Sequence, residues 1–451
     1  MKKILYMSLC IVIILAVTGL SAGAQTIRVG LVRNFEGRNS ISISTNNIDV
    51  GRGLPCGSFD FSRSLQSSSG FTVSVESGQV VIRAGGQTVF TFTNDVAGGR
   101  QVRASSGTLA LGSYSYRGVV EFRPSGGRVS AINVICVEQY LYGVVAMEMA
   151  PSFYAEALRA QAVAARTFAM YSARRGRYVS REFDICDRTC CQAYNGSTRE
   201  FDANTRAVRD TNGLIIVAPG GNIPLFTPYF SSSGGSTDNS ENVWFEALPH
   251  LRGVVDGYER VARTWTRTYT WAQLTNAVRA EAPNANIGTV TGVIIEQEHL
   301  GRVQELTFVG TNGRWTARRE QTMGVFRHID SRLLSRSFYI VGAGASGTNS
   351  VVSATDGFAY VQLPASNLYA VDAAGNVVPV GNAMAYDGVT TRRLTIQATT
   401  VSGGTGITIN GRGWGHGVGM SQNGANGMAQ AGYNFRAILH HFYTGIEIRG
   451  M

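Results

Sequence analysis

The carboxyl group of Glu148 stands in an unusual apolar setting. It lies between Met147 and Met149 in the run VVAMEMAPSFYAEALRAQAVAARTFAM, residues 144–170, which holds only one other acid, Glu156. A half-buried helix would normally carry another apolar residue at this position. The acid is therefore either chance polarity on a surface turn or a catalytic carboxyl in an apolar pocket. Burial raises a carboxyl pKa, and a carboxyl protonated near neutral pH can act as a general acid.

A glycine-rich run, GRGWGHGVGMSQNGANGM, occupies residues 411–428, and its glycines alternate from 411 to 419. The spacing does not fit the G-x-G-x-x-G pattern of a dinucleotide site. In an extended strand the alternation leaves bare backbone on one face, where another strand or a flat sugar ring can approach closely. The other face carries the side chains of Arg412, Trp414, His416, Val418 and Met420. Tight core packing explains the glycines but not Trp and His on one face. Trp414, His416 and the nearby Gln422 are therefore candidate substrate-binding residues.

A hydroxyl-rich loop, YFSSSGGSTDNSENVW, spans residues 229–244. It contains no G-x-S-x-G elbow, so it does not indicate a hydrolase serine. Loops rich in hydroxyl groups with a terminal tryptophan, here Trp244, suit carbohydrate binding, although ordinary surface loops look like this more often. Ser232, Ser233 and Gly234 are the candidate substrate-binding residues of this loop.

Three thiols lie within six residues in CDRTCCQAYNG, residues 186–196. The adjacent Cys190 and Cys191 are poorly placed to pair with each other, because disulfide geometry is strained at zero separation. Together with Cys186 they would supply three of the four ligands of a structural zinc. The alternative is one short-range disulfide with a leftover thiol, and both remain open. Because an odd number of cysteines follows residue 24, a complete disulfide framework is excluded.

The N-terminus has the pattern of a signal peptide. Lys2 and Lys3 precede an apolar segment, residues 4–20, which ends near the A-x-A-like site Ala22-Gly23-Ala24. We expect cleavage after Ala24 and export to the periplasm or the cell-wall side of the cytoplasmic membrane. The apolar run is short for a membrane span and no charged stop follows it, which favours cleavage. The alternative is an uncleaved membrane anchor. Contact with the membrane is expected only in that case.

The composition is that of a folded protein, with 44% hydrophobic and 16% charged residues. The formal net charge is +10, and arginine carries the excess because no lysine follows Lys3. A basic exported protein meets anionic polymers of the cell envelope before it meets nucleic acid. We therefore expect no nucleic-acid partner, although the charge could equally serve solubility.

The elements that must position these residues indicate an α+β fold. Alternating apolar and polar residues predict a β-rich module over 25–130. Helices are expected from Val137 to near Pro151 and over residues 154–173, where small residues share one face. Strands follow at GLIIVAP, PLFTPYF, GVIIEQE and VQELTFVG. After the signal segment, 1–24, and the β-rich module, the predicted organisation is a mixed core, 131–340, a linker and β-rich insertion, 341–404, and a C-terminal part of the core, 405–451, with two short helices.

Several long motifs in this order resemble the SpoIID/LytB family, the stage II sporulation protein D family of peptidoglycan lytic transglycosylases. They cover most of 131–340 and 405–447. Residues 26–130 resemble the β-rich lead-in of the family only loosely. The motifs are VEQYLYGVVAMEMAPSFYAEALRAQAVAARTFAM, DICDRTCCQAYNG, YFSSSGGSTDNSENVW with LPHLRGVV, and GRGWGHGVGMSQNGANGMAQAGYNFRAILHHFYTG.

The resemblance implies an α+β enzyme that cleaves the MurNAc–GlcNAc bond of peptidoglycan glycan strands, preferably strands free of stem peptides. It places the catalytic acid at Glu148 and an arginine close to that acid at Arg166. Where the family often reads Cys, then His four residues on, then Cys, this chain has Cys186, Cys190 and Cys191. The upstream His of the family's zinc site also has no match in RRGRYVSREF. A structural zinc would therefore need a fourth ligand from elsewhere.

Ordinary glycosidases flank the scissile bond with two carboxylates. Here only Glu148 lies in an apolar setting, and Asp184 and Asp187 are weaker second candidates. One acid suffices if the C6 hydroxyl of the sugar attacks C1, which gives a 1,6-anhydroMurNAc end without hydrolysis. The position of Glu148 at a helix C-terminus raises its pKa, whereas direct pairing with Arg166 would lower it. The rival function is a non-catalytic, peptidoglycan-binding enhancer of a cell-wall amidase, which keeps the groove and does not need Glu148.

Overall fold

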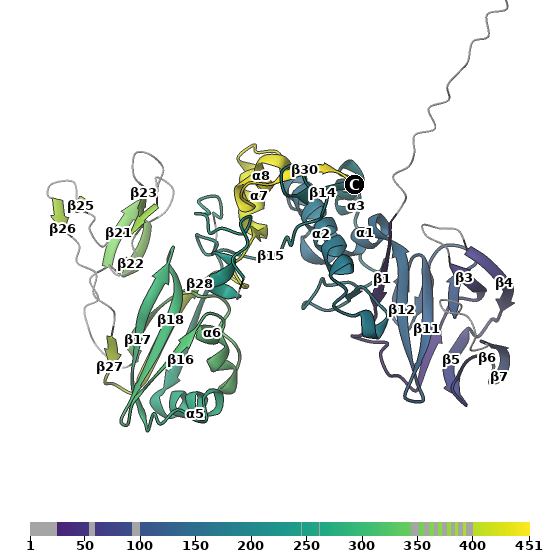
Figure 1. Ribbon diagram of the computed structural model, residues 1–451, viewed down its shortest axis with the longest axis horizontal. Coiled ribbons are helices and arrows are strands. Elements are labelled where there is room, and N and C mark those ends of the chain that lie inside the picture. Colours follow the sequence, from purple (N-terminus) through teal and green to yellow (C-terminus); the bar gives the residue numbers. More distant parts are fainter. Residues whose placement is uncertain are drawn as a thin grey trace, which may run out of the picture.

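The computed structural model describes residues 25–53, 59–92, 100–244, 246–260, 262–343 and 400–451, together with short strands between 351 and 393 (Figure 1). The predicted signal segment, 1–24, and residues 344–350 of the predicted linker lie outside the described residues. The described residues combine several sheets with helices, so the predicted α+β class is confirmed. Within these residues, no helix has the length and apolar character needed to cross a membrane.

The N-terminal part is rich in strands, as the alternating sequence pattern predicts, and these strands form two sheets. One sheet has the strand order β13-β1-β12-β11-β8-β3-β4 and the other β10-β9-β2-β5-β6-β7. Strand β12 crosses the predicted boundary at residue 130, and one hydrophobic core joins both sheets to the helices that follow. The strands are β1 (Thr26–Gly30), β2 (Ser40–Ile43), β3 (Asn47–Gly53), β4 (Phe59–Gln66), β5 (Phe71–Glu76), β6 (Gln79–Ala84), β7 (Gln87–Thr91), β8 (Gln101–Ala104), β9 (Leu109–Leu111), β10 (Tyr114–Tyr116), β11 (Val119–Ser125), β12 (Arg128–Cys136) and β13 (Ile185–Cys186).

Two helices follow directly, and they agree with the predicted positions. Helix α1 (Val137–Glu148) ends at the glutamate that the sequence singles out, and α2 (Ala155–Arg175) begins after Pro151. Apart from Ala155 and Ala173 near its two ends, the alanines of α2 are fully buried, because their small side chains let neighbouring elements pack closely. Ala162, Ala165 and Ala169 lie in the core shared with the N-terminal sheets, whereas Leu158 lies in a second core with the C-terminal helices. Helix α2 therefore lies between two cores, at the centre of the molecule (Figure 1).

A separate core organises the part of the chain that lies apart from these helices in Figure 1. Its sheets have the orders β16-β28-β20 and β19-β18-β17-β27, and α5 begins with a capping box between Thr270 and Gln273. The elements are β16 (Thr264–Thr270), α5 (Trp271–Glu281), β17 (Val290–His299), β18 (Arg302–Gly310), β19 (Arg314–Arg318), α6 (Gln321–Gly324), η3 (Val325–His328), β20 (Ser337–Ala343), β27 (Thr400–Ser402) and β28 (Gly406–Arg412). Short hairpins occupy the predicted insertion, namely β21 (Val351–Thr355), β22 (Tyr360–Pro364), β23 (Tyr369–Val371), β24 (Val377–Pro379), β25 (Met384–Tyr386) and β26 (Thr391–Arg393).

The C-terminal segment returns to α2. Two short helices were expected there, and the structure has α7 (Gln422–Gln430) and α8 (Phe435–Phe442), whose buried residues share the second core with α2. The last strand, β30 (Glu447–Gly450), pairs with β14 (Leu214–Val217). The remaining elements are η2 (Val179–Arg181), α3 (Asp202–Asp210), β15 (Tyr229–Phe230), α4 (Ser240–Val243) and β29 (Met420–Ser421).

Candidate active-site cavity

A cavity of about 790 Å³ opens beside the C-terminal end of α1. Glu148 lines it, together with one face of α2, the cysteine segment and the segment that leads into β15. Its lining residues are Glu148, Phe168, Tyr171, Ser172, Arg175, Arg177, Tyr178, Asp184, Thr189, Cys190, Cys191, Phe226, Pro228, Tyr229, Trp244, Glu246, Leu248 and His416. The cavity thus brings together Glu148, two of the cysteines and His416, which are far apart in the sequence.

Glu148 is partly buried, and two donors hold its carboxyl group. Oε1 accepts a hydrogen bond from the backbone N–H of Ala193 at 3.3 Å, and Oε2 accepts one from the side-chain amide of Gln422 at 3.3 Å. Burial raises the pKa of Glu148 above its ordinary value, and the two hydrogen bonds oppose this shift without cancelling it. The carboxyl can therefore hold a proton at higher pH than an exposed glutamate. Of the predicted substrate-binding residues, Gln422 is the one that contacts this acid.

An aromatic wall runs along the cavity, defined here as Tyr171, Phe226, Trp244 and His416. Phe226 lies between Tyr171 and Trp244, with ring centroids 5.3 and 5.5 Å apart, and Trp244 lies 5.3 Å from His416. Rings in such a row present flat apolar faces, which suit contact with a sugar ring. Tyr171 and Phe226 were not predicted from sequence, although Phe168, Tyr171, Ser172 and Arg175 recur at the i, i+3, i+4, i+7 spacing of one helix face.

His416 is a neutral member of this wall. Burial, together with the positive charge of Arg302, lowers the pKa of His416 to about 4. Its Nδ1 accepts a hydrogen bond from the backbone N–H of Val418 at 3.1 Å. At neutral pH the ring is therefore uncharged, and it contributes shape and polarity to the cavity and not a positive charge.

The predicted extended strand over residues 411–419 is wrong beyond Arg412, where β28 ends. Gly413, Gly415, Gly417 and Gly419 adopt φ values of 82°, 116°, 88° and 77°, which are left-handed conformations that favour glycine. The side chains between them therefore do not share one face of a strand.

Close approach of another segment to this bare backbone was also expected, and the structure has it. A Cβ at Gly417 would lie 2.1 Å from Nη2 of Arg302, and one at Gly419 would lie 2.1 Å from the carbonyl oxygen of Pro228. Immediately beyond, β29 pairs in parallel with β15. The glycines are thus required by packing within the protein.

Trp414 does not line the cavity, in contrast to His416 two residues later. Its side chain is 38% exposed, and the guanidinium group of Arg263 lies 3.7 Å from the centre of its ring. The separation follows from the glycine conformations, which turn the backbone between the two residues. Trp414 and His416 therefore belong to different surfaces.

The serine loop holds a carboxylate of the protein itself. Ser232 and Ser233 donate their hydroxyl protons to Glu259 at 2.5 and 2.7 Å, and the backbone N–H of Gly234 donates to the same carboxylate at 2.8 Å. None of the three loop residues lines the cavity. The polar groups predicted to bind substrate therefore already donate hydrogen bonds to Glu259. No sequence spacing predicts this contact.

Arg166 is fully buried in α2 and lies away from the cavity lining. Its Nε and Nη2 atoms donate to the two carboxylate oxygens of Glu138, each at 2.6 Å. Its other nitrogen, Nη1, donates to the carbonyl oxygen of Leu214 at 3.2 Å. The expectation that Arg166 lies close to Glu148 is not met by these contacts, because a bidentate partner on the first turn of α1 holds its guanidinium group.

Two weaker carboxylate candidates take different positions. Asp184 lines the cavity, and its Oδ2 accepts the backbone N–H of Arg28 at 2.8 Å. Asp187 is buried outside the lining, where it accepts the backbone N–H of Arg33 at 3.0 Å. Burial raises the pKa of both aspartates. Glu246, which no sequence pattern indicated, also lines the cavity.

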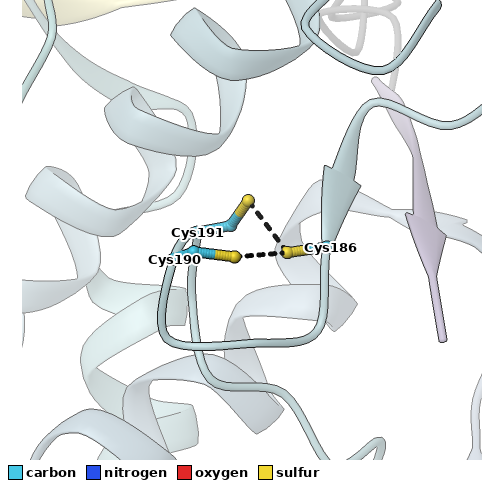
Figure 2. A group of neighbouring side chains, drawn as sticks. All are labelled: Cys186, Cys190 and Cys191. Carbon is cyan, nitrogen blue, oxygen red and sulfur yellow. Dashed lines mark hydrogen bonds between the residues drawn. The ribbon is translucent and has the colours of Figure 1, made fainter. Parts of the chain in front are cut away.

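The three clustered cysteines converge on one point (Figure 2). The Sγ atom of Cys186 lies 3.2 Å from that of Cys190 and 3.1 Å from that of Cys191, and all three sulfur atoms lie within 4.8 Å of one another. This compact set of soft donors fits a zinc ion. Cys190 and Cys191 also line the cavity, so the cluster forms part of the wall near Glu148.

These features define an α+β protein with a partly buried acid in an aromatic-walled cavity. Residues 125–217 match the family described as stage II sporulation protein. The chain is 28% identical to stage II sporulation protein D of Bacillus amyloliquefaciens over 334 residues, which are 70% of this chain and 75% of that protein. The predicted resemblance to the SpoIID/LytB family is therefore confirmed.

Two further relatives share a comparable part of the chain. An uncharacterized protein of Brachyspira hyodysenteriae is 28% identical over 342 residues, which are 75% of this chain and 74% of that protein. The amidase enhancer of Bacillus subtilis is 27% identical over 310 residues, which are 68% of this chain but 40% of the longer relative.

Proposed function

We propose that the protein remodels the bacterial cell wall as a lytic transglycosylase on peptidoglycan glycan strands. The observation that carries the proposal is the setting of Glu148, a partly buried acid with a raised pKa that lines a cavity of about 790 Å³. The volume falls in the range of small-molecule sites. Two relatives are named for sporulation and for enhancement of an amidase, which supports a role at the cell wall. The predicted signal segment would place the working protein outside the cytoplasmic membrane.

Glu148 serves as the single general acid and base in this proposal. It protonates the glycosidic oxygen and, as a carboxylate, then accepts the proton of the C6 hydroxyl while that oxygen closes onto C1. The hydrogen bonds from Ala193 and Gln422 orient the carboxyl and stabilise its charged form. The aromatic wall offers its rings to the sugars on either side of the bond. Peptide-free glycan remains the proposed substrate.

The other predicted site residues take supporting roles in the proposal. Arg166 positions the start of α1 through Glu138, and the loop of Ser232, Ser233 and Gly234 stabilises the backbone through Glu259. Cys186, Cys190 and Cys191 would hold a structural zinc that fixes the segment between β13 and the cavity. The metal would supply rigidity there, and no step of the reaction depends on it.

The alternative is a binding protein that enhances a cell-wall amidase, and the named Bacillus subtilis relative favours it. Such a protein would use the same cavity and aromatic wall to hold a glycan strand. It would need no proton transfer from Glu148. An amidase is therefore a proposed partner under this second function.

The test incubates residues 25–451 with peptide-free glycan strands and determines the masses of the products. Anhydro ends form without water, whereas a muramidase adds water at each cut, so the products differ by ~18 Da. Shortened strands with anhydro ends support the transglycosylase. Strands that bind without shortening support the enhancer. Reducing ends would require a second carboxylate, and Asp184 and Glu246, which line the cavity, would be substituted first.

A further inference from the structure

Tyr178 lies against the three clustered cysteines. Its hydroxyl oxygen is 3.4 Å from Sγ of Cys191 and 3.7 Å from Sγ of Cys186. The residue sits between the end of α2 and η2, and its side chain lines the same cavity as Glu148. One oxygen therefore lies within hydrogen-bonding distance of two of the sulfur atoms that would bind a metal.

The distances correspond to the edges of a zinc tetrahedron. With Zn–S near 2.3 Å and Zn–O near 2.0 Å, tetrahedral angles give O–S edges of about 3.5 Å and S–S edges of about 3.8 Å. The two observed O–S distances, 3.4 and 3.7 Å, lie on either side of the first value. The S–S distances of 3.1 and 3.2 Å are shorter than the second, so the thiols would have to separate slightly. The hydroxyl therefore already lies close to the edge length that a fourth ligand needs from two of the three sulfur atoms.

Packing holds the Tyr178 ring in this orientation. The ring of Phe183 lies 4.8 Å away, and the guanidinium groups of Arg177 and Arg181 lie 5.3 and 5.9 Å from the ring centre. Among the residues that the structure describes, no histidine or carboxylate joins the three cysteines in their metal-binding group. The oxygen is therefore placed by contacts independent of the thiols, as a ligand held by its surroundings should be.

We infer that the phenolic oxygen of Tyr178, which releases its proton to solvent as zinc binds, completes a Cys₃Tyr zinc site in this chain, in place of the histidine that the family resemblance implies. The inference rests on the proposed zinc binding of Cys186, Cys190 and Cys191 and is independent of glycan cleavage. A consequence is that the site ties the C-terminal end of α2 to the segment after β13. Both of these segments contribute to the cavity.

The test measures zinc binding by the full chain under reducing conditions, with a chromogenic chelator as competitor. Tyr178→Phe removes one oxygen and keeps the ring contacts, so the zinc dissociation constant should rise about tenfold or more. Tyr178→His supplies a strong nitrogen ligand and should restore tight binding. Tyr171→Phe is the matched control, because its hydroxyl lines the same cavity but contacts Arg175.

Cobalt(II) replaces zinc to report the coordination directly. The wild-type chain should give the intense visible bands of a four-coordinate site with sulfur ligands, and Tyr178→Phe should change their position and strength. A Tyr178→Phe chain that binds zinc within twofold of the wild-type constant, with an unchanged cobalt spectrum, overturns the inference. So does a reduced wild-type chain that binds no stoichiometric zinc. Neither result affects the glycan assay, so the two proposals fail separately.

Discussion

The side-chain amide of Gln422 donates a hydrogen bond to Oε2 of Glu148 at 3.3 Å, across 274 positions of sequence. Glu148 ends α1, and Gln422 begins α7. The candidate acid is therefore complete only when the C-terminal helices have returned to the core around α2. This hydrogen bond explains why the motif around Glu148 and the C-terminal motif that contains Gln422 belong to one site.

Substitution of Glu148 by glutamine should abolish most of the activity. The variant keeps the size of the side chain but cannot release a proton, so turnover should fall by roughly 10²–10⁴. The assay is shortening of peptide-free glycan strands, with the melting temperature as a check on folding. Glu156→Gln is the control, because Glu156 pairs with Arg159 and does not line the cavity. Cleavage by Glu148→Gln at the wild-type rate would remove this residue from the mechanism.

The hydrogen bond from Gln422 should set the upper pH limit of cleavage. Burial raises the pKa of Glu148, and the bond from Gln422 lowers it by stabilising the carboxylate. The general acid must be protonated, so the rate falls as pH rises through this pKa. Gln422→Leu removes the bond, so the alkaline limb of the pH–rate profile should move to higher pH. Movement to lower pH would contradict this assignment.

The two tryptophans near the glycine-rich segment should behave differently. Trp244 belongs to the aromatic wall, whereas Trp414 lies beneath Arg263 on another surface. An aromatic contact contributes about 0.5–1.5 kcal/mol beyond the area that it buries. Trp244→Ala should therefore raise the dissociation constant for peptide-free glycan by about tenfold, and Trp414→Ala should leave it nearly unchanged. Titration calorimetry with the Glu148→Gln background avoids cleavage. A larger rise in the dissociation constant for Trp414→Ala than for Trp244→Ala would instead place the glycan-binding surface at Trp414.

Arg166 should matter for stability and not for proton transfer. Its buried guanidinium group pairs with Glu138, and the loss of one partner of such a pair costs about 3–5 kcal/mol. Arg166→Met should lower the free energy of unfolding toward the lower end of this range, since Glu138 is partly exposed. Denaturant unfolding measures the loss. A stable Arg166→Met variant that binds glycan but fails to cleave it would restore the catalytic role.

The cysteine cluster should contribute to stability through the metal. Cys191→Ser removes one proposed ligand, and the melting temperature should fall more than the rate of cleavage does. A chelator should lower the melting temperature of the wild-type chain to a similar level and should have little effect on the variant. Mapping of a Cys186–Cys191 disulfide in a chain without stoichiometric zinc would instead support the disulfide alternative.

The helices and the partly buried setting of Glu148 could be predicted from sequence because local patterns determine them. The apolar repeat of α1, the alanine-rich face of α2 and the methionines around Glu148 are features of neighbouring residues. The partners of Arg166 and of Ser232 could not be foreseen. Glu138 lies 28 residues from Arg166, Glu259 lies 27 from Ser232, and no spacing rule connects them.

The extended strand predicted for the glycine-rich segment was wrong for a different physical reason. Strict alternation is the pattern of a strand, but it is equally the pattern of a backbone in which every second residue has a positive φ. The second arrangement depends on the approach of Arg302 and Pro228, which is a property of the folded chain. A tertiary contact therefore decides whether such a segment forms an extended strand or a backbone with alternating positive φ values.

The parallel pairing of β1 with β13, in which Gly30 lies opposite Cys186, has a consequence for the order of folding. The backbone N–H of Arg28 bonds Asp184 across 156 residues, so the first strand of the fold supports the segment that carries the thiols. Closure of so long a loop is a slow, late event compared with the formation of α1 and α2. Newly made chains would therefore pass through a stage with formed helices and unassembled thiols. In an oxidising compartment, a metal ion that binds those thiols early would compete with the formation of incorrect disulfides.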